Sequence, residues 1–306
     1  MKHSSEIQRI RHATRQIVRD LDFMKGSVLQ TGCSASEIHI LLELENSGEL
    51  AVSELADRLR QDKSTASRNV KALVKAGYVQ KLADPKDKRV YRLSLTPAGL
   101  EKAASVNQLA NSQVGEALEL LDEEDCQQAV HGIELYARAL QRSYQLYRIV
   151  IRPVEARDNE EMGQIIRRVM TEFGAVGAGY SIEDSEVDDI HGAYAGDRAR
   201  YFIAEREGTI LGGAGFAPLE GEQGSMCELR KMYLLPEGRR IGLGRKLLAL
   251  CLEEARGCGY EQCYLETLRR MGQAQQLYAK FGFESLKGPK GATGHFGCDA
   301  WSVKRL

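Results

Sequence analysis

The spacing of apolar residues changes near residue 147, and this change constrains the fold more than any other feature of the chain. Apolar residues recur at helical spacing from the start, beginning with residues 7–24. At Arg148–Pro153 the stretch "YRIVIRPVEARD" begins a short β-rich run instead. The chain has 306 residues, and a single hydrophobic core rarely grows beyond about 250–300 residues. We therefore expect two domains, residues 1–147 and 148–306.

The composition is that of an ordinary globular protein, with 43% hydrophobic and 28% charged residues. The longest apolar run, Leu247–Leu252, is far shorter than the roughly 18 residues that a membrane span needs. Charges at Glu6 and Arg9 interrupt any secretory signal. The seven cysteines show no CxxC spacing and the six histidines no HxxxH spacing. We expect a cytoplasmic protein with reduced thiols, no membrane partner and no metal site.

A basic segment stands out from the nearly neutral chain. Residues 58–92 contain eleven Lys or Arg against three Asp, a net charge of +8, whereas the whole chain has a net charge of −1. Such a local excess is typical of a face that binds a polyanion.

Helix signals precede and enter this segment. Ser34 with Glu37 forms a capping-box pattern that opens a second helix. Ser53 is expected to cap a short third helix and Asp62 a fourth. Gly77 stands where a left-handed helix end belongs.

Two strand-like runs follow, residues 78–82 and 90–95, on either side of "ADPKDKR". They predict a hairpin with a basic tip. Thr96 followed by proline opens a long helix, and Asp122 begins a last helix that ends near Leu146.

The fourth helix carries small polar and basic side chains on the face opposite its apolar stripe. These residues are Ser64, Thr65, Ser67, Arg68, Lys71 and Lys75. Short polar groups let a helix approach base edges in a major groove, while cations contact phosphates. We assign the first four to the groove and the two lysines to phosphates. The alternative is a solvated helix face, but no Glu lies between Lys63 and Gly77.

This order of helices, with "DPKDKRVYRLSLTPAG" after the fourth, resembles the winged helix-turn-helix of the MarR family over about residues 1–146. The resemblance implies a DNA-binding homodimer on a palindromic operator. It implies that Arg89 of the wing enters the minor groove, oriented by Asp87, with Lys88 between them. The turn Arg60–Asp62 departs from the family's hydrophobic–glycine pair. The open alternative is that this domain serves only for dimerisation.

The second half alternates strand and helix signals and predicts a mixed α/β sheet. We expect strands at residues 201–205, 210–217, 228–235, 262–267 and 300–304. One helix is expected to start at Asp158, and two more to span residues 243–256 and 273–281. Residues 174–199 are expected to form a loop with a short helix.

A glycine-rich stretch, "RRIGLGRKLL", lies between the third of these strands and a helix. It is not a Walker loop, because no GK[ST] follows, and Leu247 stands in place of the third glycine of a dinucleotide fingerprint. Glycines at a helix start let an anion reach the backbone N–H groups. The alternative is a helix start with solvated arginines.

With "ELRKMYLLPEG" before it and "LYAKFGF" after it, this loop resembles the coenzyme A motif of the GNAT acetyltransferases, over about residues 149–306. The resemblance implies acetyl-CoA as co-substrate, with its pyrophosphate on the N–H groups of residues 241–245 and its pantetheine along the preceding strand. The implied coenzyme residues are Met232, Leu234, Arg239, Arg240, Ile241, Gly242, Leu243, Gly244 and Arg245.

Two catalytic residues follow from this resemblance and from the chemistry of acyl transfer. Tyr278 matches the family's tyrosine that acts as acid toward the thiolate, and Glu228 is our candidate base for the amine. The oxyanion would be stabilised by an N–H group near Met232 or Tyr233. A solvated strand-end carboxylate is the alternative for Glu228. Met271 replaces the asparagine that the family often has seven residues before the tyrosine.

The resulting hypothesis is a mainly α winged helix-turn-helix followed by a mixed α/β GNAT fold, acting as regulator and small-molecule N-acetyltransferase. Arg230, Arg269 and His295 would suit an acceptor with a carboxylate, such as an amino acid. Two alternatives remain: an inactive acyl-CoA sensor that controls DNA binding, and a protein-lysine acetyltransferase, which the acid-rich residues 172–205 leave open.

Overall fold

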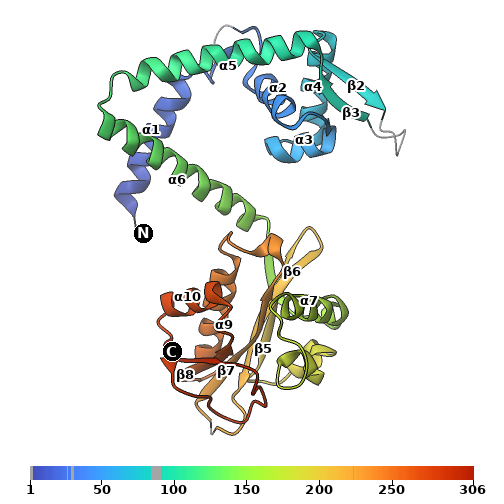
Figure 1. Ribbon diagram of the computed structural model, residues 1–306, viewed down its shortest axis with the longest axis vertical. Helices are drawn as coiled ribbons and strands as arrows, with labels where there is room; N and C mark the ends of the chain where they lie inside the picture. Colours follow the sequence, from blue (N-terminus) through green and yellow to red (C-terminus); the bar gives the residue numbers. More distant parts are fainter. Residues whose placement is uncertain (1–2, 26, 29–30, 84–90, 223) are drawn as a thin grey trace. The chain divides into compact units, whose positions relative to one another are not determined.

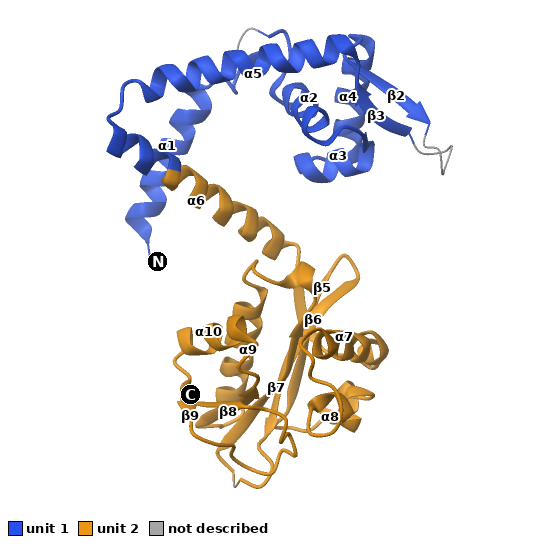
Figure 2. Ribbon diagram, viewed as in Figure 1, with its two compact units in different colours: residues 1–130 blue, residues 131–306 orange. Residues whose placement is uncertain are grey.

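The computed structural model describes residues 3–25, 27–28, 31–83, 91–222 and 224–306. The chain forms two compact units, 1–130 and 131–306 (Figure 2). Their division falls inside one continuous helix, α6 (Glu123–Tyr147). A domain boundary at 147 and 148 therefore stays a prediction.

The first unit is mainly helical (Figure 1). Its elements are α1 (Ser4–Asp20), α2 (Ala35–Ser47), β1 (Leu50–Ala51), α3 (Val52–Leu59), α4 (Lys63–Lys75), β2 (Val79–Ala83), β3 (Tyr91–Leu95), α5 (Pro97–Leu118) and the start of α6.

Three of the predicted helix starts are confirmed. Ser34 and Glu37 form a reciprocal capping box at α2. The Asp62 carboxylate accepts a hydrogen bond of 2.8 Å from the Thr65 N–H at the start of α4. Thr96 caps α5, whose first residue is proline. Each cap satisfies a backbone donor that the helix itself leaves unpaired.

The predicted cap of α3 is wrong. The helix begins at Val52, its N-cap is Ala51, and Ser53 lies within the first turn. The Glu54 carboxylate accepts the Ala51 N–H at 2.6 Å and so replaces a serine cap. After α3, Arg60 adopts φ +54°, the left-handed conformation that a glycine usually supplies in this turn.

A small antiparallel sheet with strand order β1-β3-β2 closes this unit. The short strand β1 escaped prediction because two residues carry no periodicity. The sheet packs on α2, α3 and α4 through a core that includes Leu41, Leu55, Leu73 and Leu93. The opposite side of α4 is therefore left for solvent or a partner.

The second unit is a mixed α/β fold, as predicted. Its main elements are β4 (Val150–Pro153), α7 (Asn159–Glu172), α8 (Ile190–Ala193), β5 (Arg200–Arg206), β6 (Thr209–Pro218), β7 (Met226–Leu234), α9 (Leu243–Gly257), β8 (Gln262–Thr267), α10 (Gly272–Lys280), β9 (Glu284–Leu286) and β10 (Ala300–Arg305).

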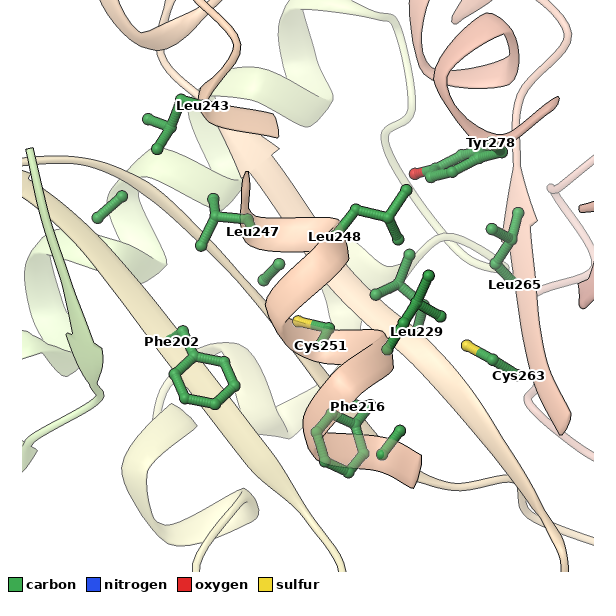
Figure 3. Close-up of a cluster of buried hydrophobic side chains, with 14 of the residues drawn as sticks. Phe202, Phe216, Leu229, Leu243, Leu247, Leu248, Cys251, Cys263, Leu265 and Tyr278 are labelled. Carbon is green, nitrogen blue, oxygen red and sulfur yellow. The ribbon is translucent and has the colours of Figure 1, made fainter. Parts of the chain in front are cut away.

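The seven strands form one sheet in the order β4-β5-β6-β7-β8-β10-β9. All neighbours are antiparallel except β7 and β8. In Figure 1, α7 lies on one face of the sheet and α9 with α10 on the other. Each face has its own apolar core, one around Met162 and Ile166 of α7 and one around Leu247 and Leu248 of α9. Figure 3 shows the second core.

The predicted loop with a short helix at 174–199 is confirmed, since only α8 and two short 3-10 turns occur there. Within the described residues, none of the helices combines the length and apolar character that a membrane crossing requires.

Candidate active site and nucleic-acid interface

Strands β7 and β8 run parallel but pair only at their starts. Among the described residues, their ladder joins Met226–Glu228 to Gln262–Tyr264. Beyond it, β7 continues to Leu234 and β8 to Thr267. A pocket of about 80 Å³ opens where the strands part, lined by residues of both strands and of α10. One edge of β7 is thus open to a ligand.

A β-bulge interrupts β7 in its ladder with β6, the strand on the side away from β8. The register with β6 shifts between Gly213 and Gly215, and Lys231 on β7 adopts φ +49°. The Tyr201 hydroxyl donates a hydrogen bond of 2.9 Å to the Lys231 carbonyl and holds the bulge from the other face. Bulges of this kind re-aim the neighbouring backbone and side chains. Here the bulge lies next to Met232, near which an oxyanion donor was predicted.

The glycine-rich loop sits at the far end of β7. Gly242 has φ +100° and is the N-cap of α9, and it provides no side-chain hydrogen bond to the first turn. The first turn of α9 carries no acidic residue. At Gly244, an added Cβ would approach Met232 Cε to 3.3 Å. The first N–H groups of α9 therefore have no capping side chain that would compete with an anion.

The arginines of this loop differ in their partners. Arg239 forms a bidentate ion pair with Glu172 at 2.5 and 2.7 Å, and its Nε donates to the Leu234 carbonyl. The Arg245 guanidinium lies over the Phe281 ring at 5.3 Å, and Arg240 adopts φ +61°. The charge of Arg239 is thus already neutralised, and its predicted contact with the coenzyme stays a prediction.

Glu228 is the last residue of β7 that pairs with β8, and it is 3% exposed. Its Oε2 accepts a hydrogen bond of 2.6 Å from Arg230 Nε. Burial raises the pKa of Glu228, and Arg230 only partly offsets this effect. The interpretation of Glu228 as a solvated strand-end carboxylate is wrong, because the residue is buried and pairs with Arg230; Glu228 also lines the pocket.

Tyr278 on α10 lines the same pocket and lies at the margin of the core in Figure 3. Its hydroxyl donates to Met232 Sδ at 4.0 Å, and its ring packs against Phe283 at 5.8 Å. Burial raises the pKa of Tyr278 well above its ordinary value, so the hydroxyl stays protonated and can donate.

The predicted DNA-reading face of α4 is exposed. Ser64, Arg68, Lys71 and Lys75 are exposed and Thr65 and Ser67 half-buried, while the opposite face packs inward. The hydroxyls of Ser64 and Thr65 donate to Asp62 at 2.5 and 2.7 Å. Within the described part of the chain, neither Lys71 nor Lys75 forms an ion pair. The wing residues Asp87, Lys88 and Arg89 lie outside the described residues.

Among the residues that the structure describes, the α-helices α1 and α6 contain no buried residue. They expose apolar side chains at helical spacing, among them Ile10, Ile17, Ile133 and Leu140. Such amphipathic faces need a partner surface.

Comparison with known proteins relates the two halves of the chain to two different families. The sequence model of the acetyltransferase (GNAT) family matches residues 164–283, and that of the MarR family matches residues 33–91. The uncharacterized N-acetyltransferase YjgM of Escherichia coli is 37% identical over 158 residues, which are 51% of this chain and 95% of that protein. The chain belongs to the GNAT acetyltransferase family.

The first half also carries a MarR-family winged helix-turn-helix domain. The HTH-type transcriptional repressor MdtR of Bacillus subtilis is 29% identical over 116 residues, 38% of this chain and 75% of that protein. Among solved structures, a GNAT-family acetyltransferase from Staphylococcus aureus aligns with a TM-score of 0.45 at 21% identity, over 52% of this chain and 99% of that one.

The GNAT domain contains an ionic network that the sequence did not reveal. The Lys231 side chain is 2% exposed, and its Nζ pairs with Glu186 at 2.5 Å and also with Asp184. Asp184 Oδ2 in turn lies 2.9 Å from His295 Nε2. Burial opposes the imidazolium, but the hydrogen bonds to Asp184 and Glu266 raise the pKa of His295 to about 9.

Glu228, Glu266 and His295 bring one ligand-type atom each within 4.8 Å of one another. The Glu266 side chain is 3% exposed, and its Oε2 lies 3.5 Å from His295 Nδ1. No spacing rule could find this group because the three residues come from β7, β8 and the segment before β10.

The three residues that suited a carboxylate acceptor already have partners. Arg230 pairs with Glu228, His295 pairs with Asp184, and Arg269 bonds to Asp299. Met271, which replaces the family's asparagine, is the N-cap of α10 and accepts a weak hydrogen bond from Thr267 at 3.8 Å. An acceptor with a carboxylate would have to exchange with these pairs.

Proposed function

We propose that this chain is a DNA-binding regulator and an N-acetyltransferase that moves acetyl from acetyl-CoA to the amine of a small molecule by direct attack. One observation carries the catalytic part. Where β7 and β8 separate, the buried carboxylate of Glu228 and the hydroxyl of Tyr278 share one pocket, and β7 leads from it to the uncapped start of α9.

The coenzyme is assigned to the open edge of β7 and the loop that follows. The N–H groups of residues 241–245 would hold the pyrophosphate at the positive end of α9. Pantetheine would pair with the backbone at Met232 and Leu234. Because the Leu234 carbonyl accepts from Arg239, Met232 offers the less contested partner. Acetyl-CoA supplies the thioester that reacts.

Glu228 is assigned as the base. An amine arrives protonated and must lose a proton before it can attack. A carboxylate whose pKa is raised by burial takes that proton more readily than a solvated one. Arg230 Nε, 2.6 Å from Glu228 Oε2, favours the ionised form of this carboxyl and so opposes the effect of burial on its pKa.

Tyr278 is assigned to the leaving thiolate. The conjugate acid of that thiolate has a pKa of about 8.5, below the raised pKa of Tyr278. The hydroxyl therefore stabilises the sulfur mainly by donating a hydrogen bond. An N–H group beside the bulge, at Met232 or Tyr233, would serve the oxyanion.

The acceptor is assigned to the class of small amines, including amino acids. The ionic network beside the pocket contains four carboxylates, Asp184, Glu186, Glu228 and Glu266, against Arg230, Lys231 and a charged His295. Of the four carboxylates, Glu228 and Glu266 line the pocket itself. This balance suits a cationic amine.

The DNA-binding part is assigned to α4 and the wing, acting as a homodimer on a palindromic operator. The exposed cations of α4 support phosphate contacts. The apolar faces of α1 and α6 support a dimer. A mobility shift on the DNA upstream of the protein's own gene, with sedimentation to establish the dimer, tests this part.

The enzymatic part is tested by release of free thiol from acetyl-CoA over a panel of amines and amino acids. Wild type should release thiol with at least one acceptor. Glu228→Gln should lower kcat/KM by about 10²–10⁴, and Tyr278→Phe should lower kcat. The exposed Glu284→Gln on β9 is the matched control and should change neither.

Acetyl-CoA binding without thiol release for any amine would contradict this assignment and favour an acyl-CoA sensor. Transfer only to lysine side chains of proteins would favour the protein acetyltransferase.

A further inference from the structure

A second pocket of about 420 Å³ lies between the end of α6 and the start of α9, within the second unit. It is lined by Ala139, Arg142, Ser143, Leu146, Tyr147 and Lys246. Its volume falls in the range of ligand pockets, about 300–1,000 Å³. It is separate from the pocket that holds Glu228 and Tyr278.

This pocket borders the glycine-rich loop on one particular side. A Cβ added at Gly242 would stand 3.2 Å from Leu146 Cδ1 on the wall of the pocket. A Cβ added two residues later, at Gly244, would instead approach Met232 and the open edge of β7. The loop thus has a pantetheine side at Gly244 and an opposite side at Gly242. The second pocket thus adjoins the loop on its Gly242 side.

The end of α6 is fixed in this position. Leu146 packs against the core that includes Ile241 and Leu243 of the loop and helix start. The Leu146 carbonyl accepts a hydrogen bond of 3.2 Å from the Ile149 N–H. The pocket wall formed by α6 is therefore part of the folded second unit.

The lining is basic and aromatic. Arg142 and Lys246 form no ion pair with any residue in the described ranges, in contrast to Arg239, which Glu172 neutralises. None of the lining residues is acidic. The Tyr147 side chain is 88% exposed, so its ring is open to a flat partner. Two unpaired cations beside a free aromatic ring suit a phosphate joined to a nucleobase.

We propose that this pocket binds the 3′-phosphoadenosine end of the acyl-CoA, with Arg142 and Lys246 on the 3′-phosphate and Tyr147 against the adenine. The inference rests on the proposed function, because it needs the pyrophosphate on the loop. It extends the coenzyme site onto a helix that begins at Glu123 and precedes the matched GNAT region.

Calorimetric titration of the full chain with coenzyme A and with 3′-dephospho-coenzyme A tests the phosphate contact. A charge-assisted pair is worth roughly tenfold to a hundredfold in affinity. We expect wild type to prefer coenzyme A by that factor and the double variant Arg142→Gln, Lys246→Gln to prefer it less than threefold. Arg138→Gln, one turn earlier on α6 and paired with Glu134, should keep the wild-type preference.

Equal affinity of wild type for both ligands would overturn the inference, as would a double variant that keeps the preference. The ratio of the two affinities is the readout, so general damage to the variant does not imitate the expected result. Tyr147→Ala should lower the affinity for both ligands by the same factor, and Tyr147→Phe should keep the wild-type affinities. If Tyr147→Ala lowers neither affinity, Tyr147 does not contact the adenine.

These titrations need no turnover and so separate this inference from the proposed function. If the protein prefers coenzyme A but releases no thiol with any amine, the subsite is supported and the enzymatic assignment is refuted. If the protein turns over acetyl-CoA and its dephospho analogue with equal KM, the subsite is refuted and the enzymatic assignment is supported.

Discussion

The basic side chains of α4 and those of β7 with its following loop lie in opposite environments. On α4, the cations Lys71 and Lys75 are exposed and, in the described part of the chain, form no ion pair. Along β7 and the following loop, Arg230, Lys231 and Arg239 are all paired with carboxylates, and Lys231 is 2% exposed. Both regions belong to domains that act on phosphate-bearing partners.

The difference follows from the partner. A DNA backbone presents many phosphates to an open surface, so free and solvated cations provide its affinity. A single coenzyme in a cleft can use fixed N–H groups instead. Under the proposed function the start of α9, whose first turn contains no acidic residue, would supply them. By contrast, the start of α4 is closed by the Asp62 carboxylate. Under the proposed function, the paired ions along β7 would serve positioning and acid–base chemistry.

The largest expected effect comes from breaking a buried pair. Lys231→Met leaves Asp184 and Glu186 without their cation and should lower the free energy of unfolding by about 3–5 kcal/mol. The exposed Lys75→Met on α4 should change it by less than about 0.5 kcal/mol. Chemical denaturation of both variants measures this contrast. Equal losses would mean that burial does not distinguish the two lysines.

The next largest effect is expected from an aspartate placed at the N-cap of α9, where α4 has Asp62. Gly242→Asp places a carboxylate where the pyrophosphate is assigned and should weaken acetyl-CoA binding about 100-fold through charge repulsion. Gly242→Asn is the matched control, because it has the same shape and meets the same φ of +100°. If both variants bind acetyl-CoA equally well, the helix start is not the anion site.

In the DNA-binding domain, removal of unpaired cations should change how DNA affinity depends on salt concentration. Lys71→Gln with Lys75→Gln should weaken DNA binding by roughly tenfold or more. It should also reduce the slope of log K against log salt concentration by about 0.9 for each lost phosphate contact. Lys280→Gln on α10, equally exposed, should leave the slope unchanged. Fluorescence anisotropy at several salt concentrations measures it; an unchanged slope in the double variant would exclude both lysines from the DNA contact.

A smaller effect concerns pH in the GNAT domain. The pKa of His295 is raised to about 9 by Asp184 and Glu266, against its burial and against Lys231. A raised pKa stabilises the fold fully below the unfolded value of about 6.5, and this stabilisation is lost as pH rises through 9. The stability difference between wild type and His295→Gln should therefore shrink from pH 6.5 to 9.5. A difference that grows over this window would contradict the pairing.

Much of the fold followed from local sequence signals. The caps at Ser34, Asp62 and Thr96 and the glycine at Gly77 are local patterns, and the structure confirms them. The cap of α3 was missed because Glu54 satisfies the Ala51 N–H from inside the helix, a role that spacing alone did not distinguish from a serine cap.

The site was predictable only where it is continuous in sequence. Gly242 and its neighbours form one motif, so their place at the start of α9 was expected. The pair of Arg239 with Glu172 joins positions 67 residues apart, and His295 meets Asp184 across 111 residues. Such contacts depend on how the sheet brings segments together, which periodicity does not encode. The pocket at Arg142 and Lys246 also crosses the predicted domain boundary.

The most direct test measures both ligands on the same full-length samples of wild type, Gly242→Asp, and Lys71→Gln with Lys75→Gln. We predict that Gly242→Asp loses affinity for acetyl-CoA about 100-fold while it keeps the salt slope of wild type for DNA. The double lysine variant should show the reverse, with weaker DNA binding and unchanged acetyl-CoA affinity. If either variant loses both ligands together, the two anion sites are not built separately, and the account is contradicted.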